Sequence, residues 1–461
     1  MKALTVFLTA ALLCTVTPVL AKETPPAGGE PKAFKLTAQR SITLDNGLSV
    51  TFVQYGNTPK VTLRLLTETG NVDDGDKDAV SDLSYQLLLE GSKNRDAKTI
   101  AQQAALMGGQ LNTSVDVNSS FLEIDVLSEF VGDATALLAD LVVNPQFTDA
   151  DKTRLVTSFV RDLKVAKSEA QNQAAEAFYQ HLFAGHPYSK IFADAAKVET
   201  LTLADCQQFV QNHLVASRSH LFISGQFNEA TAEKAVREAF AGMVAGKGRL
   251  LTNPNSSAKP GLVFIPRDKA VQSTIRLGLP VVDPSHPDYV GLDLLNTVIG
   301  GSFGSRITRN IREDKGYTYS PGSSVNSRIK AAVWFEQADV TAESTAAALS
   351  EIIKEIRLLQ STPPSDQELS NFKSYKGGIY VLQNSSRGAI INQLWNLKIH
   401  GLPMTYLENY VQNINAITPA QLSALAQKYL PVEQMTLILV GDPAAKAQLA
   451  ADPVLKALYK L

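Results

Sequence analysis

Apolar residues recur at helical spacing in the stretch AVSDLSYQLLLEGS, residues 79–92. Val80, Leu83 and Leu87 fall on one stripe of such a helix, so this stripe is expected to face a protein core. Another face of the same helix carries Asp82, Tyr85, Gln86 and Leu89. The pattern therefore predicts a helix with one buried stripe and a second face whose polar residues need a separate explanation.

The same succession of patterns occurs twice along the chain. The strand-like segment TLRL at 62–65 is matched by TIRL at 274–277, and LFISG at 221–225 is matched by LILVG at 437–441. LFISG and LILVG are 216 residues apart. The helical residues that precede them match at the same offset: Thr202, Ala204, Gln211 and Leu214 correspond to Thr418, Ala420, Gln427 and Leu430. A repeat of strands and helices in this order predicts an α+β fold with two homologous halves, each a mostly antiparallel sheet covered by helices.

Two stretches rich in Pro, Gly and charged residues mark the expected boundaries. Residues 22–40 are predicted to form a flexible N-terminal segment, and residues 245–260 are predicted to be a linker. They delimit an N-terminal domain at 41–244 and a C-terminal domain at 261–461.

The first residues, 1–21, have the parts of a secretory signal peptide: an early lysine, an apolar run at 3–13 and a small residue, Ala21, at the expected cleavage site. A lipid anchor on Cys14 is disfavoured because a leucine precedes that cysteine. No later stretch is apolar for the roughly 18 residues that a transmembrane helix needs. We therefore expect export across the inner membrane to the periplasm, with no membrane span after cleavage.

Composition narrows the function further. With 461 residues, 44% hydrophobic and 19% charged, the chain is long enough to bury several cores. Its net charge of -2 gives no electrostatic reason to bind nucleic acid or an anionic membrane surface. After signal cleavage the only cysteine is Cys206, which cannot form an internal disulfide.

The duplicated halves, with a strand, a helix and LEGS near the start, resemble the pitrilysin or insulinase family of metallopeptidases over nearly the whole mature chain. In that family the helix carries the inverted zinc motif H-x-x-E-H. Its histidines hold Zn²⁺, and its glutamate takes a proton from the metal-bound water. The resemblance implies that the two halves face each other across a cleft.

The family's motif positions fall on Asp82, Tyr85 and Gln86, and its third zinc ligand, a glutamate, falls on Asp162. Asp82 and Asp162 could each offer an oxygen. However, Gln86 is a neutral amide, and Tyr85 is a poor general base because a free phenol has a pKa near 10. The six histidines include no pair four residues apart on a helix face. We therefore expect no catalytic zinc, and no other cofactor, in this chain.

The second half retains more of the family pattern in GGSFGSRITRNIREDKGYTYS, residues 300–320. In family members an arginine and a tyrosine of this stretch lie across the cleft from the zinc, and here they are Arg312 and Tyr319. The resemblance implies that they hold a substrate carbonyl or its oxyanion. Gly316 is expected to end the helix, so that Tyr319 starts the next strand. The alternative is that Arg312 interacts with a helix end and Tyr319 packs on a strand.

A substrate strand is suggested in the first half by MGGQLNTSVDVNSSFLEIDVL, residues 107–127. It resembles the family's glycine pair, asparagine and following edge strand, to which an extended peptide can add by backbone hydrogen bonds. Asn112 is the substrate-binding residue that this resemblance implies. The alternative for Asn112 is a turn residue that caps a hairpin.

A serine hydrolase must also be considered, because GGSFG matches G-x-S-x-G around Ser302. That motif requires a strand before the serine, whereas Val290, Leu294, Leu295, Val298 and Ile299 follow helical spacing. His400 is the only later histidine. The motif is therefore a weak indication of this chemistry.

The resemblance implies a non-catalytic subunit that supplies Arg312 and Tyr319 to a zinc-bearing homologous partner. Mitochondrial processing peptidase and some bacterial family members divide the work between two chains in this way. The expected substrate is a peptide or an unfolded protein. The alternative is a purely structural or peptide-binding scaffold with no role in proteolysis, like the family's core subunits in a respiratory complex.

Overall fold

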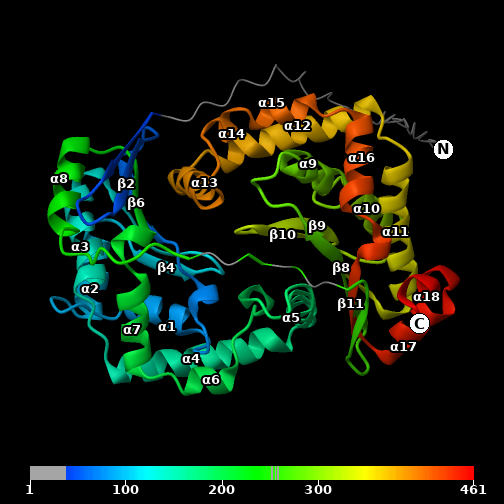
Figure 1. Ribbon diagram of the computed structural model, residues 1–461, viewed down its shortest axis with the longest axis horizontal. Coiled ribbons are helices and arrows are strands. Elements are labelled where there is room, and N and C mark those ends of the chain that lie inside the picture. Colours follow the sequence, from blue (N-terminus) through cyan, green and yellow to red (C-terminus); the bar gives the residue numbers. More distant parts are fainter. Residues whose placement is uncertain (1–37, 251–252, 255, 257–258) are drawn as a thin grey trace, which may run out of the picture. The chain divides into compact units, whose positions relative to one another are not determined.

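The computed structural model describes residues 38–250, 253–254, 256 and 259–461 (Figure 1). The expected signal peptide, 1–21, and most of the expected N-terminal segment, 22–40, lie outside these residues. The first strand, β1 (Gln39–Thr43), begins inside that segment. In the described part of the chain, no helix is long and apolar enough to cross a bilayer.

The first half contains one sheet with the strand order β1-β2-β6-β3-β5-β4. Its neighbours are antiparallel except for the parallel pair of β2 and β6. The remaining strands are β2 (Ser49–Gln54), β3 (Lys60–Thr67), β4 (Leu111–Val115), β5 (Ser120–Leu127) and β6 (Ser219–Gly225). The helices are α1 (Val80–Leu87), α2 (Ala97–Leu106), α3 (Val131–Val143), α4 (Asp149–Ser168), α5 (Ala170–Leu182), α6 (Ala195–Glu199), α7 (Leu203–His213) and α8 (Glu229–Ala239).

The second half contains a sheet with the order β7-β11-β8-β10-β9, in which only β7 and β11 are parallel. Its strands are β7 (Gly261–Pro266), β8 (Gln272–Val281), β9 (Gly322–Arg328), β10 (Ala331–Thr341) and β11 (Thr436–Gly441). Its helices are α9 (Tyr289–Ile299), α10 (Arg306–Thr308), the π-helical turn η5 (Arg309–Asp314), α11 (Thr345–Ser361), α12 (Asp366–Gln383), α13 (Arg387–His400), α14 (Thr405–Glu408), α15 (Tyr410–Ala416), α16 (Pro419–Tyr429), α17 (Pro443–Ala451) and α18 (Pro453–Tyr459).

The two sheets confirm the predicted duplication and the α+β class. The matched sequence segments lie on corresponding strands, β3 and β8 in one case and β6 and β11 in the other. The helices before β6 and β11 both begin with a capping box, formed by Thr202 with Asp205 and by Thr418 with Gln421. Strand β1 has no counterpart among the described residues of the second half, where β7 is the edge strand.

Each half contributes one helix to the sheet of the other half. Helix α5 packs Phe178 and neighbouring residues against Val333, Ile438 and Val440 of the second sheet. Helix α13 packs Ile391 and neighbouring residues against the first sheet. At the start of α13, Arg387 donates to Asp125 of β5 at 2.8 Å. These apolar contacts and this ion pair therefore help to hold the two halves together.

The segment predicted as the linker is fixed where the structure describes its beginning. Ser217 donates its N–H to the carbonyl of Ala245 at 2.9 Å. The side chain of Arg249 is buried, donates to the carbonyl of Asn118 at 2.9 Å and pairs with Asp73 at 3.2 Å. Because a buried guanidinium needs such partners, this part of the linker is held against the first half.

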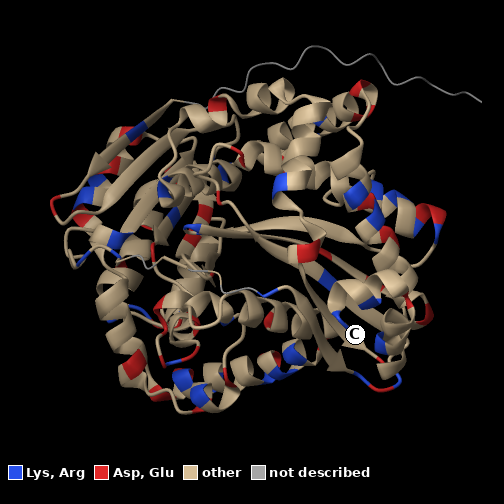
Figure 2. Ribbon diagram, turned by 45° about the vertical axis from the view of Figure 1, so that its right-hand side comes forward, with Lys and Arg blue, Asp and Glu red and all other residues tan. Residues whose placement is uncertain are grey.

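Charged residues of both signs are interspersed over the helices of both halves (Figure 2). This distribution agrees with the net charge of -2.

Candidate functional site

Helix α1 has the two faces that its sequence predicts. Val80, Leu83 and Leu87 are buried in the core of the first half. The carboxylate of Asp74 accepts from the N–H groups of Ala79, at 3.1 Å, and Ser81, at 3.0 Å, and so caps the helix from the preceding loop. Burial raises the pKa of Asp74 to about 7.

The second face of α1 has no general base at the position where the family has its catalytic glutamate. Asp82 accepts from the Asn71 amide at 2.7 Å, and burial raises its pKa to about 6. Tyr85 is only 1% exposed, and burial raises the pKa of its hydroxyl further above its ordinary value. Gln86 is half-buried. A neutral phenol therefore stands where the family has its catalytic glutamate.

The position of Asp162 corrects the expectation for the third zinc ligand. Asp162 lies on the exposed side of α4, with 67% of its side chain accessible, and pairs with Arg161 at 3.0 Å. Instead, α4 turns Phe159 and Leu163 toward a cavity of about 240 Å³ that Asp82 also lines. A shift of one residue on a helix rotates a side chain by about 100°, which explains the error.

This cavity does not fit a zinc ion. Apolar side chains occupy its α4 wall, and the ammonium of Lys190 lies at its rim, where it pairs with Asp78 at 2.6 Å. A catalytic zinc site needs three protein ligands, commonly histidine nitrogens and a carboxylate. Throughout 38–250, 253–254, 256 and 259–461 there is no group of three or more His, Cys, Asp or Glu that could hold a metal. The donor chemistry of α1 and α4 thus opposes a metal here.

The raised pKa of Asp82 predicts a dependence of stability on pH. The unfolded chain releases this proton near pH 3.8 and the folded chain near pH 6, so stability falls as the pH rises through this interval. Because the amide introduced by Asp82→Asn cannot ionise, this substitution is expected to reduce the loss in free energy of unfolding by about 3 kcal/mol. Urea unfolding at about pH 4 and about pH 7 measures the effect, with the exposed Asp162→Asn as a control that changes it by less than about 0.5 kcal/mol. Equal pH dependence in Asp82→Asn and the wild type would contradict this account of α1.

The second half presents Arg312 and Tyr319 together. Gly316, with φ +65°, ends η5 as predicted, and Tyr317 donates its N–H back to the carbonyl of Ile311 at 2.8 Å. The guanidinium of Arg312 lies 5.0 Å from the ring centroid of Tyr319. This contact is a cation–π interaction between a residue in the last turn of η5 and a residue of the loop that follows it.

Tyr319 does not start a strand, contrary to the prediction, because β9 begins only at Gly322. The loop is fixed one residue earlier: Thr318 forms a bridge to Val340, and its hydroxyl donates to the carbonyl of Asp339 at 2.6 Å. Tyr319 is 81% exposed. Thr318 is thus anchored, while the ring of Tyr319 projects into solvent. The alternative that Tyr319 packs on a strand is therefore wrong.

A third aromatic residue completes this group. The ring centroid of Phe303 lies 4.3 Å from the guanidinium of Arg312, and the ring is 67% exposed. No motif in the sequence predicts a role for Phe303. Its signal was a large apolar residue flanked by Ser and Gly in a loop. Phe303, Arg312 and Tyr319 form what we call the Arg312 group.

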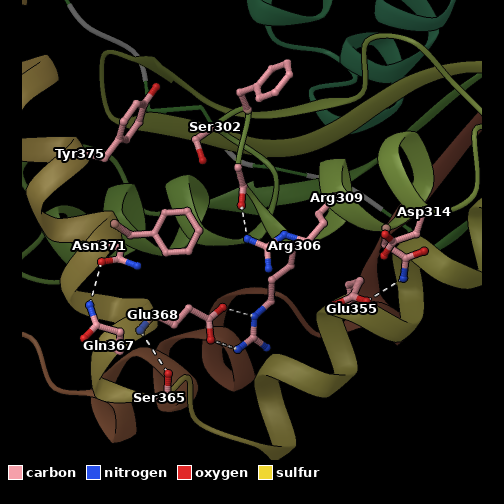
Figure 3. A pocket seen from close by; sticks show the side chains of 14 residues that line it. Ser302, Arg306, Arg309, Asp314, Glu355, Ser365, Gln367, Glu368, Asn371 and Tyr375 are labelled. Carbon is pink, nitrogen blue, oxygen red and sulfur yellow. Dashed lines mark hydrogen bonds and ion pairs between the residues drawn. The ribbon is translucent and has the colours of Figure 1, made fainter. Parts of the chain in front are cut away.

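Phe303 also lines a cavity of about 700 Å³ in the second half (Figure 3). Arg306 donates to both carboxylate oxygens of Glu368 at 2.8 Å across it. Beside Arg306, Asn310 donates its side-chain amide to Glu355 at 2.7 Å. The bidentate ion pair ties α10 to α12 and so supports the helix that precedes Arg312.

The serine-hydrolase reading is not supported by the geometry of Ser302. Helix α9 precedes the loop, as its periodicity predicts. The hydroxyl of Ser302 donates to the carbonyl of Thr297 at 2.9 Å. A nucleophile elbow requires a strand before the serine and a base beside it. The Ser302 hydroxyl instead satisfies a carbonyl in the last turn of α9.

Asn112 lies in β4, the edge strand of the first sheet, and is exposed. The prediction placed the edge strand after this residue, whereas the strand begins at Leu111. The hairpin turn lies further on, where Asp116 donates its N–H to the carbonyl of Ser119 at 2.8 Å. Asn112 is therefore a strand residue and not a turn cap. Its side chain borders an edge to which a further strand could pair.

The comparisons with known proteins agree with this geometry. Residues 50–195 match the family model described as "Insulinase (Peptidase family M16)", and residues 200–375 match "Peptidase M16 inactive domain". The chain belongs to the insulinase family. The structure of this insulinase-family chain resembles the crystal structure of a peptidase M16 inactive domain from Pseudomonas fluorescens with a TM-score of 0.82. The two are 23% identical, and the match covers 88% of this chain and 98% of the other.

Two relatives show the range of the insulinase family around this chain. An "Uncharacterized zinc protease" of Rickettsia bellii is 25% identical over 290 residues, 61% of this chain and 68% of the relative. A "Non-peptidase homolog YmxG" of Helicobacter pylori is 21% identical over 378 residues, 81% of this chain and 87% of the relative. Relatives named for proteolysis and for its absence thus both align with this chain.

Proposed function

We propose that this chain is the non-catalytic subunit of a zinc metalloendopeptidase. It acts after export, in the periplasm, and supplies Arg312 and Tyr319 to a zinc-bearing homologous partner. The observation that carries the proposal is a contrast between the halves. Helix α1 lacks the zinc donors, whereas Arg312 and Tyr319 lie together and exposed on the second half.

The chemistry of the Arg312 group suits a scissile peptide bond. When water adds to a peptide carbonyl, negative charge develops on the carbonyl oxygen, and donors placed there stabilise it. The phenol hydroxyl of Tyr319 and the guanidinium of Arg312 are such donors. The contact of Arg312 with two rings restricts its motion before substrate arrives, which lowers the entropy lost on binding. The partner's metal would supply the activated water.

The exposed edge of β4 is the proposed peptide-binding strand. From the hairpin pair of Asp116 and Ser119, the alternation of an antiparallel ladder turns the N–H of Thr113 away from β5. An extended peptide could accept from this N–H, and the side chain of Asn112 could bind the same peptide. An unfolded segment is the substrate class that such backbone pairing selects.

This role of β4 predicts a loss of peptide affinity in Thr113→Pro. Proline removes the outward N–H, and one hydrogen bond contributes about 0.5–1.5 kcal/mol, so affinity should fall by up to about tenfold. Asn112→Ala should lower the affinity for the peptide by a similar factor. Fluorescence anisotropy with an unstructured peptide measures both, and Thr113→Val, which keeps the N–H, serves as the control. Equal affinity in Thr113→Pro and Thr113→Val would exclude backbone pairing at this position.

The proposal is tested by isolating this chain with its natural partners. Affinity purification from the native host should recover a homologue with an intact H-x-x-E-H motif in a stable complex. Recovery of assemblies without such a homologue, repeated under mild cross-linking, would favour the scaffold instead. The relative named as a non-peptidase homologue gives this second function its support.

A further inference from the structure

A buried glutamate lies beneath the point from which both segments of the Arg312 group extend. Glu336 of β10 is 0% exposed, and it pairs across the sheet with Ser323 of β9 on one side and Leu277 of β8 on the other. The amide of Gly322 approaches its carboxyl, but neither oxygen completes a hydrogen bond in the described part of the chain. A buried polar group without partners is costly, so its presence calls for an explanation.

The carboxyl touches the start of the loop that carries Phe303. A Cβ atom at Gly300 would collide with Oε2 of Glu336 and with the hydroxyl of Ser323, so only glycine permits this close approach. Ser323 donates its N–H to the carbonyl of Gly300 at 3.1 Å. Gly300 and Ser323 therefore form a junction, and Glu336 lies directly against it.

Both arms of the Arg312 group start from this junction. After Gly300 the chain forms the loop with Phe303 and continues through α10 into η5, which carries Arg312. Before Ser323 the chain forms the loop that carries Tyr319. A displacement of the junction would thus change the spacing between the Arg312 guanidinium and the Tyr319 ring.

The surroundings of Glu336 are uncharged. Asn296 of α9 accepts from the Ser323 hydroxyl at 2.7 Å and from the Trp334 indole at 3.0 Å, and so occupies its acceptor oxygen. The charged residue of α9, Asp293, is directed to Lys376 at 2.7 Å. On β8, Arg276 lies against the ring of Phe335 on the other face of the sheet. Burial without a compensating charge raises the pKa of Glu336 well above its ordinary value.

We infer that Glu336 is a positioning residue whose uncharged carboxyl supports the junction of Gly300 and Ser323 and thereby fixes the geometry of the Arg312 group. In this form the carboxyl packs without the large penalty of a buried, unpaired charge. Ionisation would draw in water or displace the junction. The consequence for catalysis rests on the proposed function, whereas the effect on the two loops does not.

Two measurements on the full chain alone test the inference. In a Trp395→Phe background Trp334 is the sole tryptophan, since the chain has two. It lies two positions from Glu336 on the same face of β10, so its emission should change in a pH titration with a midpoint above the ordinary range of a glutamate. Adding Glu336→Gln, which has the same shape and no charge, should abolish this transition.

Hydrogen exchange then reports on the loops themselves. Above the pH of this transition, the amides of 300–304 and 317–323 should be at least about tenfold less protected in the wild type than in Glu336→Gln, since only the wild type carries an ionisable carboxyl at this position. At a pH below the transition the two chains should match. Identical titrations, or identical protection at every pH, would overturn the inference.

The reconstituted peptidase provides the catalytic test. Above the pH of the transition seen in the tryptophan titration, Glu336→Gln should keep its kcat, whereas the wild type loses it. Assembly should be equal in both. The same pH dependence of kcat in the wild-type and Glu336→Gln complexes would contradict the positioning role. If neither reconstituted complex were active, the proposed function would fail. The hydrogen-exchange data would still decide the effect of Glu336 on the two loops.

Discussion

Replacing Tyr319 with phenylalanine is expected to lower kcat of the reconstituted peptidase by about 10²–10³-fold, the loss typical of one oxyanion donor. The change removes only the hydroxyl, and the ring can keep its contact with Arg312, whose guanidinium lies 5.0 Å away. Because Tyr319 is 81% exposed, the stability of the chain should be unchanged. Arg312→Ala should produce a loss of the same order by removing the second donor.

Steady-state kinetics with saturating partner separates this effect from assembly. A suitable control is Arg357→Ala on α11, whose side chain pairs with Glu433 at 2.9 Å on the surface. It should keep wild-type turnover. Binding of the partner, measured by light scattering or calorimetry, should be the same in every variant. Wild-type turnover in both Tyr319→Phe and Arg312→Ala would remove the proposed role of the Arg312 group.

Phe178→Ala is expected to lower the free energy of unfolding by about 3–5 kcal/mol, the usual cost of truncating a buried phenylalanine. Phe178 is 0% exposed on α5, and its ring lies 6.1 Å from that of Phe335 on the second sheet. The guanidinium of Arg276 lies 5.4 Å from the same ring. The truncation would leave a cavity between α5 and the sheet of the other half.

Urea unfolding monitored by circular dichroism measures this loss. Phe303→Ala is the matched control, because the same truncation at a 67% exposed ring should change stability by less than about 0.5 kcal/mol. Equal stabilities of the two variants would mean that α5 does not contribute to the core shared by the halves.

The fold could be predicted from the sequence where the pattern is local and repeated. The strand segments around Leu65 and Leu277, and the capping threonines Thr202 and Thr418, are local signals that occur twice, so the duplication and the α+β class follow from them. The stripe of Val80 on α1 is likewise a local periodicity. Helices α5 and α13 each cover the sheet of the other half. This packing depends on contacts between distant segments, so no local sequence pattern predicts it.

The candidate site was predictable in its composition but not in its geometry. Arg312 and Tyr319 follow from a motif, and the structure adds that the Arg312 guanidinium lies 5.0 Å from the Tyr319 ring. Asp162 was misplaced because motif spacing does not fix the rotation of a helix, on which Leu163 rather than Asp162 faces the cavity. The role of Glu336 arises from its contact with Gly300, and no sequence spacing relates two such positions.

On the proposed function, this chain cannot activate water by itself, although it binds the peptide bond that its partner hydrolyses. The most direct test is zinc content by mass spectrometry, combined with peptide hydrolysis by the purified chain before and after chelation. The account predicts less than one zinc per chain and no chelator-sensitive hydrolysis until the zinc-bearing partner is added. One tightly bound zinc per chain, with autonomous hydrolysis that Gln86→Ala abolishes together with the metal, would contradict it.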